Sequence, residues 1–283
     1  MARPLRIEYP FAVYHVTSRG NEKKPIFKYD SDRELFLNIL DQTVKRHHWL
    51  CHAYCLMDNH YHLLIETPDA NLSIGMRQVN GIYTQAFNKV HKRTGHLFQG
   101  RYHAILIQKD SHLLEVSRYV VLNSVRAGIT SVPERYRWSS YAATAGLRDK
   151  HACLSTGWIL GQFHDSKRQA EKRYRAFVKE GIGDRIWEGL RGQSLFGEDG
   201  FVEQLKPYLR EKADTDEIPK AQRYVDRPDL KKLFKTGMNI TKRTETIVDA
   251  VMNYGYSQKE IADMLGLHYS TISRLVKKHH LQE

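Results

Sequence analysis

His60 and His62 are separated by a single residue in a strand-like run of the chain. Alternate residues of a β-strand point to the same face, so the two imidazoles are predicted to project together. Two neighbouring imidazoles can bind one divalent cation, and a bound cation could polarise a phosphate oxygen. The chain contains fifteen histidines, so a half-exposed strand with two polar histidines explains the spacing equally well.

Tyr119 is the candidate nucleophile. It lies on a helix predicted over residues 111–126, where the apolar residues share one side and Glu115, Tyr119 and Arg126 lie roughly opposite. Asn123 is four residues further on and is therefore a neighbour of Tyr119 on the helix surface. A phenol can attack phosphorus to form a covalent phosphotyrosine, which conserves bond energy for a later strand joining. The chain has sixteen tyrosines, so a surface tyrosine without chemistry is the default alternative.

The charge of the chain favours a polyanionic partner. The formal net charge is +12, and the segment from Ala70 to Lys109 contains no acidic residue. Basic side chains gathered in one segment suit contacts with nucleic-acid phosphates. The phosphate contacts predicted within this segment are Arg77, Lys89, Lys92, Arg93 and Arg101.

Aromatic residues alternate with these basic residues and could offer faces for unpaired bases. They are Tyr83, Phe87, Phe98, Tyr102 and His103. Tyr83 and Phe87 also fit the spacing of a helix with one buried face. For these two we favour a place in the protein core.

Strand and helix signals alternate over the first 145 residues. Strands are predicted at 11–18, 50–57, 60–67 and 102–108, and helices at 30–47, 72–90 and 111–126. The order β-α-β-β-α-β-α is the split βαβ pattern of a ferredoxin-like antiparallel sheet with helices on one face. We therefore predict an α+β fold with a catalytic domain over residues 1–145.

The rest of the chain is predicted to be all-α. Residues 146–235 are interpreted as a helical connector and linker, and residues 236–283 as a helix-turn-helix domain. Ser257 and Glu260 have the spacing of a capping box, which predicts the start of a helix. A three-helix bundle without a ligand is the alternative. The residues predicted to face a duplex major groove are Tyr269, Ser270, Ser273, Arg274 and Lys277.

Several classes of protein are excluded by composition. No run approaches about 18 uninterrupted apolar residues, so no membrane partner is expected. The N-terminus lacks the apolar segment of a secretory signal. The three cysteines, Cys51, Cys55 and Cys153, favour free thiols in a reducing compartment over a disulfide or a zinc site. We therefore expect a cytoplasmic, nucleoid-associated protein.

Three sequence blocks resemble the REP-associated tyrosine transposases, which are part of the wider HUH single-tyrosine transposase family. The blocks are MDNHYHLL at 57–64, FQGRY at 98–102 and SRYVVLNSVRAG at 117–128, and AVYHVTSRGN at 12–21 and WSSY at 138–141 fit the same family. The resemblance covers roughly residues 1–145. Two positions depart from the family pattern: Ser124 stands where proline is usual, and Tyr61 where an aliphatic residue is usual.

The resemblance implies a role for each candidate. His60 and His62 would be the metal pair, Asn123 a third ligand of Mg²⁺ or Mn²⁺, and Tyr119 the nucleophile. The family acts on single-stranded DNA at hairpin-forming palindromes and leaves a 5′-phosphotyrosine and a free 3′-hydroxyl. Arg19, Asn21 and Arg126 are further predicted DNA contacts. In relatives the tyrosine acts within one chain or across a dimer, so both a monomer and a homodimer remain open.

Two other functions remain open. One is a non-catalytic, sequence-specific DNA-binding regulator, in which the helix-turn-helix binds duplex DNA and the first domain is a scaffold. The other is a ferredoxin-like platform that binds RNA on paired aromatic residues, which a His-Tyr-His strand fits poorly. The transposase is favoured over both alternatives because one chain contains the two histidines, Tyr119 and Asn123.

Overall fold

Four strands form an antiparallel sheet in the computed structural model, which describes residues 7–183, 186–191, 194–213, 227–234 and 237–280. They are β1 (Ala12–Arg19), β2 (Leu50–Leu56), β3 (His60–Thr67) and β4 (His103–Ile107). The strands lie side by side in the order β2-β3-β1-β4. Helix α1 (Asp30–His47) connects β1 to β2, and α2 (Leu72–Val90) connects β3 to β4. The predicted α+β, ferredoxin-like order is confirmed.

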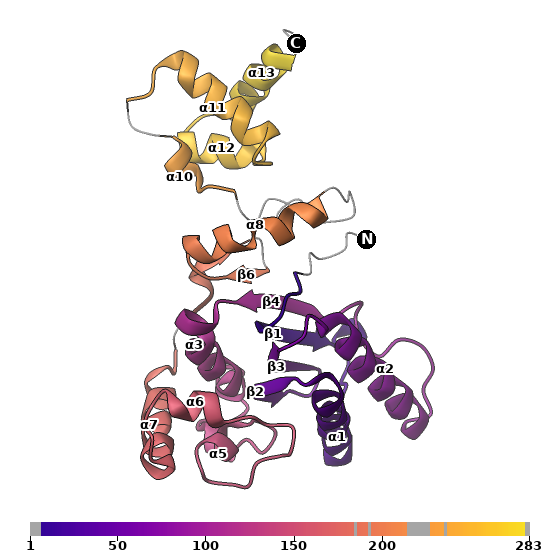
Figure 1. The fold of residues 1–283 in the computed structure, drawn as a ribbon. Helices are drawn as coiled ribbons and strands as arrows, with labels where there is room; N and C mark the ends of the chain where they lie inside the picture. Colours follow the sequence, from indigo (N-terminus) through magenta and orange to yellow (C-terminus); the bar gives the residue numbers. More distant parts are fainter. Residues whose placement is uncertain (1–6, 184–185, 192–193, 214–226, 235–236, 281–283) are drawn as a thin grey trace. The chain divides into compact units, whose positions relative to one another are not determined.

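Helices cover both faces of this sheet, whereas the sequence predicted helices on one face (Figure 1). Helix α3 (Lys109–Val121) lies on the face opposite α1 and α2. The ring of Tyr61 is 4.8 Å from Phe36 of α1, while the ring of its neighbour His62 is 6.1 Å from Tyr119 of α3. Every residue of β3 after His60 is buried, so both faces of the strand require a covering layer.

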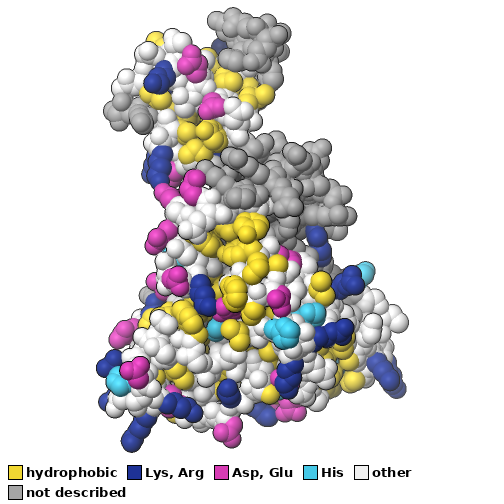
Figure 2. Space-filling model, in the orientation of Figure 1, with side chains coloured by type: hydrophobic (Ala, Val, Ile, Leu, Met, Phe, Trp, Pro, Cys, Tyr) yellow, Lys and Arg dark blue, Asp and Glu magenta, His cyan; other side chains and the backbone are white. Residues whose placement is uncertain are grey.

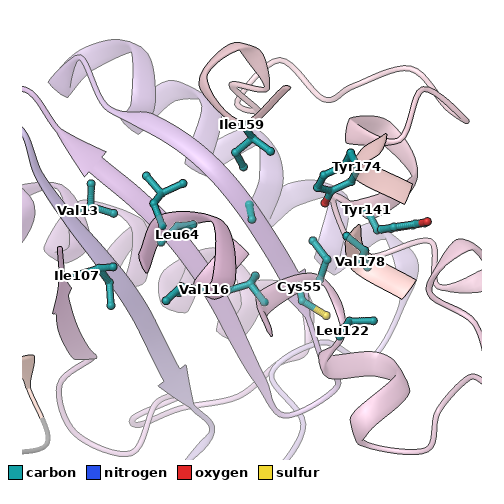
Figure 3. Close-up of a cluster of buried hydrophobic side chains, with 14 of the residues drawn as sticks. Val13, Cys55, Leu64, Ile107, Val116, Leu122, Tyr141, Ile159, Tyr174 and Val178 are labelled. Atoms are coloured by element: carbon teal, nitrogen blue, oxygen red, sulfur yellow. The ribbon is translucent and has the colours of Figure 1, made fainter. Parts of the chain in front are cut away.

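The core beneath α3 joins the sheet to the helices that follow it (Figure 3). Apolar residues of the sheet contact the buried side of α3. Tyr141 of α5 (Tyr141–Thr144) and Tyr174 of α7 (Lys167–Glu180) continue the same cluster. A fully buried Val or Leu side chain contributes about 1.5–3 kcal/mol, so this layer is a major part of the stability.

The helix that carries Tyr119 is shorter than predicted. Helix α3 ends at Val121, Leu122 has φ −86° and ψ −1°, and a separate turn of helix, α4, spans Asn123–Arg126. The hydroxyl of Ser124 is buried and has no hydrogen-bond partner among the residues that the structure describes.

Two short strands extend the sheet beyond β4. Strand β6 (Leu195–Phe196) pairs with β4 in parallel. Strand β5 (Leu190–Arg191) precedes β6 in the chain and lies next to it at the edge of the sheet. The prediction of a wholly helical region after residue 145 missed both, because strands of two residues have no periodicity to detect. The remaining helices before them are α6 (Gly157–Gly161) and the 3-10 turns η1 (Asn21–Lys23), η2 (Pro133–Arg135) and η3 (Ile186–Gly189).

The chain divides into two compact units, and each is described by itself. One comprises residues 6–190 and 194–201; the other consists mainly of residues 202–283. The later helices are α8 (Asp199–Ala213), α10 (Leu230–Leu233), α11 (Ile240–Met252), α12 (Gln258–Leu265) and α13 (Tyr269–His280). The predicted domain boundaries at 145 and 235 do not coincide with this division and remain predictions about function.

The last three helices have their own apolar core. It contains Ile247, Ala250, Ile261, Ala262, Ile272 and Val276. The predicted capping box is present, because Ser257 Oγ accepts from the amide of Glu260 and the Glu260 carboxylate accepts from the amide of Ser257. Gly266 ends α12 with φ 63°, a conformation that favours glycine. No helix in the described part of the chain is long and apolar enough to cross a membrane.

A buried carboxylate ties the start of α3 to the sheet. Glu66 of β3 is 2% exposed and accepts hydrogen bonds from Lys109 Nζ at 2.6 Å. Its other oxygen lies 2.8 Å from Nε2 of the buried His52. Burial acts to raise the pKa of Glu66, but the bonds to His52 and Lys109 outweigh it and hold the pKa below its usual value. Lys109 is the first residue of α3, so this pair fixes where the helix begins.

Removing the charge of Glu66 should therefore destabilise the protein. We expect Glu66→Gln to lower the free energy of unfolding by about 1–3 kcal/mol at pH 7. Because the folded-state pKa is lowered, the stabilisation is present above the ordinary carboxyl pKa and is lost as the pH falls through the lowered value. Denaturant titrations at pH 7 and pH 4 should show the difference from wild type shrinking at the lower pH.

The matched control is Glu34→Gln. Glu34 pairs with Arg137 at 3.0 Å on the surface, where both side chains are 56% exposed. Such exposed pairs contribute about 0–1 kcal/mol, so this variant should unfold nearly as the wild type does. Equal stabilities of Glu66→Gln and Glu34→Gln at pH 7 would show that the buried pair does not anchor α3.

Candidate active site

Strand β3 presents His60 and His62 together, as the spacing predicted. Their ring centroids are 5.0 Å apart and the ring planes are inclined by 76°. Burial lowers the pKa of His60, helped by Arg19 and opposed by Asp58. Burial also holds the pKa of His62 well below its usual value, with further contributions from His15 and His60. Both rings are therefore neutral at pH 7, which is the form that binds metals.

The tautomer of His60 is set by Asn59. His60 Nδ1 lies 2.7 Å from Asn59 Oδ1, and Asn59 Nδ2 donates to the carbonyl of Lys23 at 3.0 Å. A carbonyl only accepts, so the nitrogen of the Asn59 amide faces Lys23 and its oxygen faces His60. His60 Nδ1 must then carry the proton, and Nε2 keeps its lone pair for a cation.

The turn that carries Asn59 is held by the loop after β1. The carbonyl of Asp58 accepts from the amides of Ile26 at 2.9 Å and Phe27 at 3.1 Å, and the carbonyl of Asn59 accepts from Gly20 at 2.8 Å. A Cβ on Gly20 would lie 2.0 Å from the carbonyl oxygen of Lys24, so only glycine allows this backbone approach. The loop thereby fixes the end of β3 from which His60 projects.

Helix α3 places Tyr119 beside His62. The Tyr119 ring centroid is 6.1 Å from that of His62, with the planes inclined by 81°. The guanidinium carbon of Arg126 lies 5.0 Å from the centroid of the Tyr119 ring. A cation in this position favours negative charge on the phenol oxygen and on an approaching phosphate. The grouping of Tyr119 with Arg126, inferred from helical spacing, is present in the structure.

Asn123 lies one turn from Tyr119 but is not hydrogen-bonded to either histidine. Its amide nitrogen donates to the carbonyls of Tyr119 at 2.9 Å and Val120 at 3.3 Å. These bonds occupy Nδ2 and leave Oδ1 as the atom that could bind a metal. The structure thus brings His60, His62 and Tyr119 together, and holds Asn123 beside Tyr119.

The side chains present fit a divalent ion that is completed by oxygen ligands. No group of three or more His, Cys, Asp or Glu residues that could hold a metal occurs among the residues described. Two imidazoles and the amide oxygen of Asn123, which lies one helical turn from Tyr119, would leave further positions for water or phosphate oxygens. His60 Nε2 and His62 Nε2 have no hydrogen-bond partner in the described residues.

Two residues of the site were not predicted from the sequence. His15 of β1 is buried and its Nε2 lies 2.9 Å from His62 Nδ1. Burial lowers the pKa of His15 to about 3, with a smaller contribution from His103. Trp187 of η3 packs its ring 5.1 Å from Tyr119 and 5.2 Å from His15. Strand alternation could have placed His15 on the face of His62, but no sequence signal links Trp187 to the site.

The predicted phosphate contacts are mostly at the surface. Arg93 is half-buried, with its guanidinium 5.6 Å from the centroid of the Phe87 ring. The exposed ones are Arg19, Asn21, Arg77, Lys89, Lys92, Arg101 and Arg126. Arg19 donates to Gln99 at 2.9 Å. Figure 2 shows Lys and Arg side chains spread among Asp and Glu on the face in view. Their contact with DNA stays a prediction.

The aromatic residues between these basic residues belong largely to the core. Tyr83 and Phe87 are fully buried, as favoured from the sequence. Phe98 and Tyr102 are also buried, which corrects the prediction that they offer faces to unpaired bases. Their burial follows from ring contacts in the core, such as that between Phe98 and Tyr61 at 6.0 Å.

The predicted duplex contacts lie along α13. Tyr269 is 56% exposed and Arg274 is exposed, whereas Ser270 and Ser273 are half-buried. Ser270 Oγ is 2.8 Å from His268 Nδ1. The side chain of Lys277 lies outside the described residues. The use of this helix in DNA binding remains a prediction.

The chain is similar to known transposases in sequence over part of its length. Residues 10–123 match the model of a family described as transposase IS200 like. No curated protein matches the chain. A solved structure of a REP-associated tyrosine transposase bound to a REP hairpin is similar, with 14% identity and a TM-score of 0.46, over 55% of this chain and 93% of that one. A likeness at this TM-score supports no transfer of function. In sequence, the segment that carries His60, His62 and Tyr119 resembles the IS200-like transposases.

Proposed function

We propose that this chain is a DNA transposase that cuts and rejoins single-stranded DNA at hairpin-forming palindromes, through a tyrosine nucleophile and a divalent metal. One observation carries the proposal: the ring of Tyr119 lies 6.1 Å from that of His62, beneath the guanidinium of Arg126. A nucleophile, a pair of metal-binding imidazoles and a cation thus meet at one place. The match of residues 10–123 to a transposase family supports the same reaction class.

The chemistry follows from these side chains. His60 and His62, with Asn123 Oδ1, would hold Mg²⁺ or Mn²⁺, which when bound polarises the scissile phosphate. The oxygen of Tyr119 gives up its proton and forms a new P–O bond, while the bond to the 3′-oxygen breaks and that oxygen takes up a proton and leaves as a hydroxyl. The product is a 5′-phosphotyrosine. Attack on it by another 3′-hydroxyl reverses the step and joins two strands.

Two features favour catalysis over a purely regulatory role. The hydrogen bonds from His60 to Asn59 and from Asn59 to Lys23 leave the outer nitrogen of His60 ready for a metal. Arg126 lies over the Tyr119 ring at 5.0 Å, where its charge could stabilise a phenolate or an approaching phosphate. We propose that the helices α11 to α13 add binding of duplex DNA, and that the enzyme acts as a monomer or a homodimer.

The nucleophile can be tested by removing one oxygen atom. Tyr119→Phe keeps the ring and its contacts, so the fold should survive while cleavage of a hairpin substrate falls by at least about 10³-fold. The covalent protein–DNA adduct, detected by denaturing gel and peptide mapping, should disappear. Tyr61→Phe is the matched control, because Tyr61 faces α1 and α2 and donates to Asn80 on the opposite side of the sheet. An adduct that maps to Tyr61 would overturn the assignment.

The metal pair can be tested by the loss of each imidazole. His60→Ala and His62→Ala should each lower cleavage by at least about 100-fold, since even the loss of an outer partner of a metal ligand costs about 10–100-fold. Binding of the hairpin should be largely retained. His48→Asn is the control: His48 is an exposed histidine with φ 55°, a backbone conformation that asparagine also adopts. Full cleavage in excess EDTA would contradict the metal requirement.

The role of the C-terminal helices can be separated from cleavage with variants of the full chain. Tyr269→Ala and Arg274→Ala should each weaken binding to the preferred duplex by about 1–3 kcal/mol, as loss of a base contact does. Both should nick a single-stranded hairpin at the wild-type rate. Lys242→Ala removes an exposed charge from α11 and serves as the control. Unchanged duplex affinity in all three variants would mean that α13 does not contact bases.

A further inference from the structure

His15 and His62 share one hydrogen bond inside the protein. His15 Nε2 and His62 Nδ1 are 2.9 Å apart, and the two ring planes are within 3° of parallel. Parallel rings in face-to-face contact would keep their atoms about 3.5 Å apart or more. The shorter distance therefore means that the rings lie nearly in one plane and meet edge to edge, with centroids 5.2 Å apart. This is the geometry of an in-plane hydrogen bond between two imidazoles.

A hydrogen bond between two imidazole nitrogens needs one proton between them, so two arrangements satisfy this bond when each ring carries one proton. In the first, His62 Nδ1 donates to His15 Nε2, and His62 Nε2 keeps a lone pair that can bind a cation. In the second, His15 Nε2 donates to His62 Nδ1, and His62 Nε2 carries the proton and cannot bind a cation. The partner His15 thus determines whether His62 is a ligand.

The other nitrogen of His15 has no competing bond. His15 Nδ1 is buried and has no hydrogen-bond partner among the described residues, and His15 as a whole is 3% exposed. No neighbouring acceptor or donor therefore commits His15 to either tautomer. The proton of His15 is free to follow the state of His62, and binding of a cation at His62 Nε2 selects the first arrangement.

The ring of His15 is also held in place mechanically. Trp187 lies against it with centroids 5.2 Å apart and planes inclined by 19°. Tyr119 stands nearly perpendicular to it, at 5.8 Å and 84°. His15 therefore has little room to rotate away from His62, and the hydrogen bond fixes the direction in which His62 Nε2 points.

We propose that His15 is a positioning residue, which accepts a hydrogen bond from His62 Nδ1 and so directs His62 Nε2 toward the bound cation. The inference rests on the proposed function, since it requires that His62 binds a metal. His60 is prepared for the cation by Asn59, and His15 performs the same task for His62 from a different strand. Partners of this kind orient metal-binding histidines and raise their basicity.

Two substitutions of His15 separate its hydrogen bond from its packing. His15→Phe keeps a flat ring against Trp187 but offers no acceptor. His15→Gln places an amide oxygen near the position of Nε2, where it can accept from His62 Nδ1. We expect His15→Phe to weaken the binding of Mn²⁺ to the DNA-free protein by about 10–100-fold and His15→Gln to restore most of it. Electron paramagnetic resonance of free Mn²⁺ measures this affinity without any cleavage.

Two further measurements complete the test. The nitrogen chemical shifts of His62 should report a proton on Nδ1 in wild type and His15→Gln with a diamagnetic cation, Mg²⁺, bound. The Mn²⁺ concentration for half-maximal cleavage should rise in His15→Phe, and excess Mn²⁺ should restore the rate, which it would not do for a misfolded site. Thermal unfolding of each variant shows whether the fold is kept.

The outcomes distinguish this inference from the proposed function. In one outcome, His60→Ala and His62→Ala lose Mn²⁺ binding while His15→Phe keeps the wild-type affinity. This result overturns the role of His15 and leaves the metal pair intact. Mn²⁺ binding that none of these variants changes overturns both. Weaker binding in His15→Phe and in His15→Gln alike, with both variants folded, would mean that the ring and not its acceptor matters, and would also overturn the inference.

Discussion

The packing of α3 on one face of the sheet determines the distances in the candidate site. The buried side of this helix contacts Val13, Leu64 and Ile107 of the sheet, and the salt bridge from Lys109 to Glu66 fixes where the helix begins. Tyr119 is on the same helix, so its separation from His62 follows from that packing. A shift of α3 along the strands would move Tyr119, the proposed nucleophile, and leave the histidines in place.

Side chains alternate along β3, so Tyr61 and Tyr119 lie on opposite faces of the sheet. Tyr61 is next to the histidines in sequence, and Tyr119 is near His62 in the fold. His62 faces α3 and Tyr119, whereas Tyr61 faces α1 and α2 and donates to Asn80 at 2.6 Å. Burial also raises the pKa of Tyr61 far above its usual value. Strand geometry and burial thus place Tyr61 away from the candidate metal pair next to it in sequence, whereas Tyr119 lies near His62 on a helix far along the chain.

Sequence periodicity predicted the elements that have a long apolar pattern. Residues 30–47 and 72–90 were predicted as helices and form α1 and α2 with those bounds, and the paired histidines project together as predicted. Three features could not be predicted. The interruption of α3 at Leu122 has no helix-breaking residue, β6 has only two residues, and Trp187 reaches Tyr119 solely through tertiary contact.

The parallel pairing of β4 with β6 has a consequence for the order of folding. The amide of Leu106 donates to the carbonyl of Ser194, and the amide of Gln108 donates to the carbonyl of Phe196. The chain from β4 to β6 must therefore close a long loop before these bonds form. Loop closure of this length costs entropy that local helices and hairpins do not incur. The antiparallel strands with His60 and His62 can therefore form first, and the segment around Trp187 docks afterwards. The two hydrogen bonds also lie near the edge of the sheet, so this edge can open locally while the β1–β3 ladder stays formed.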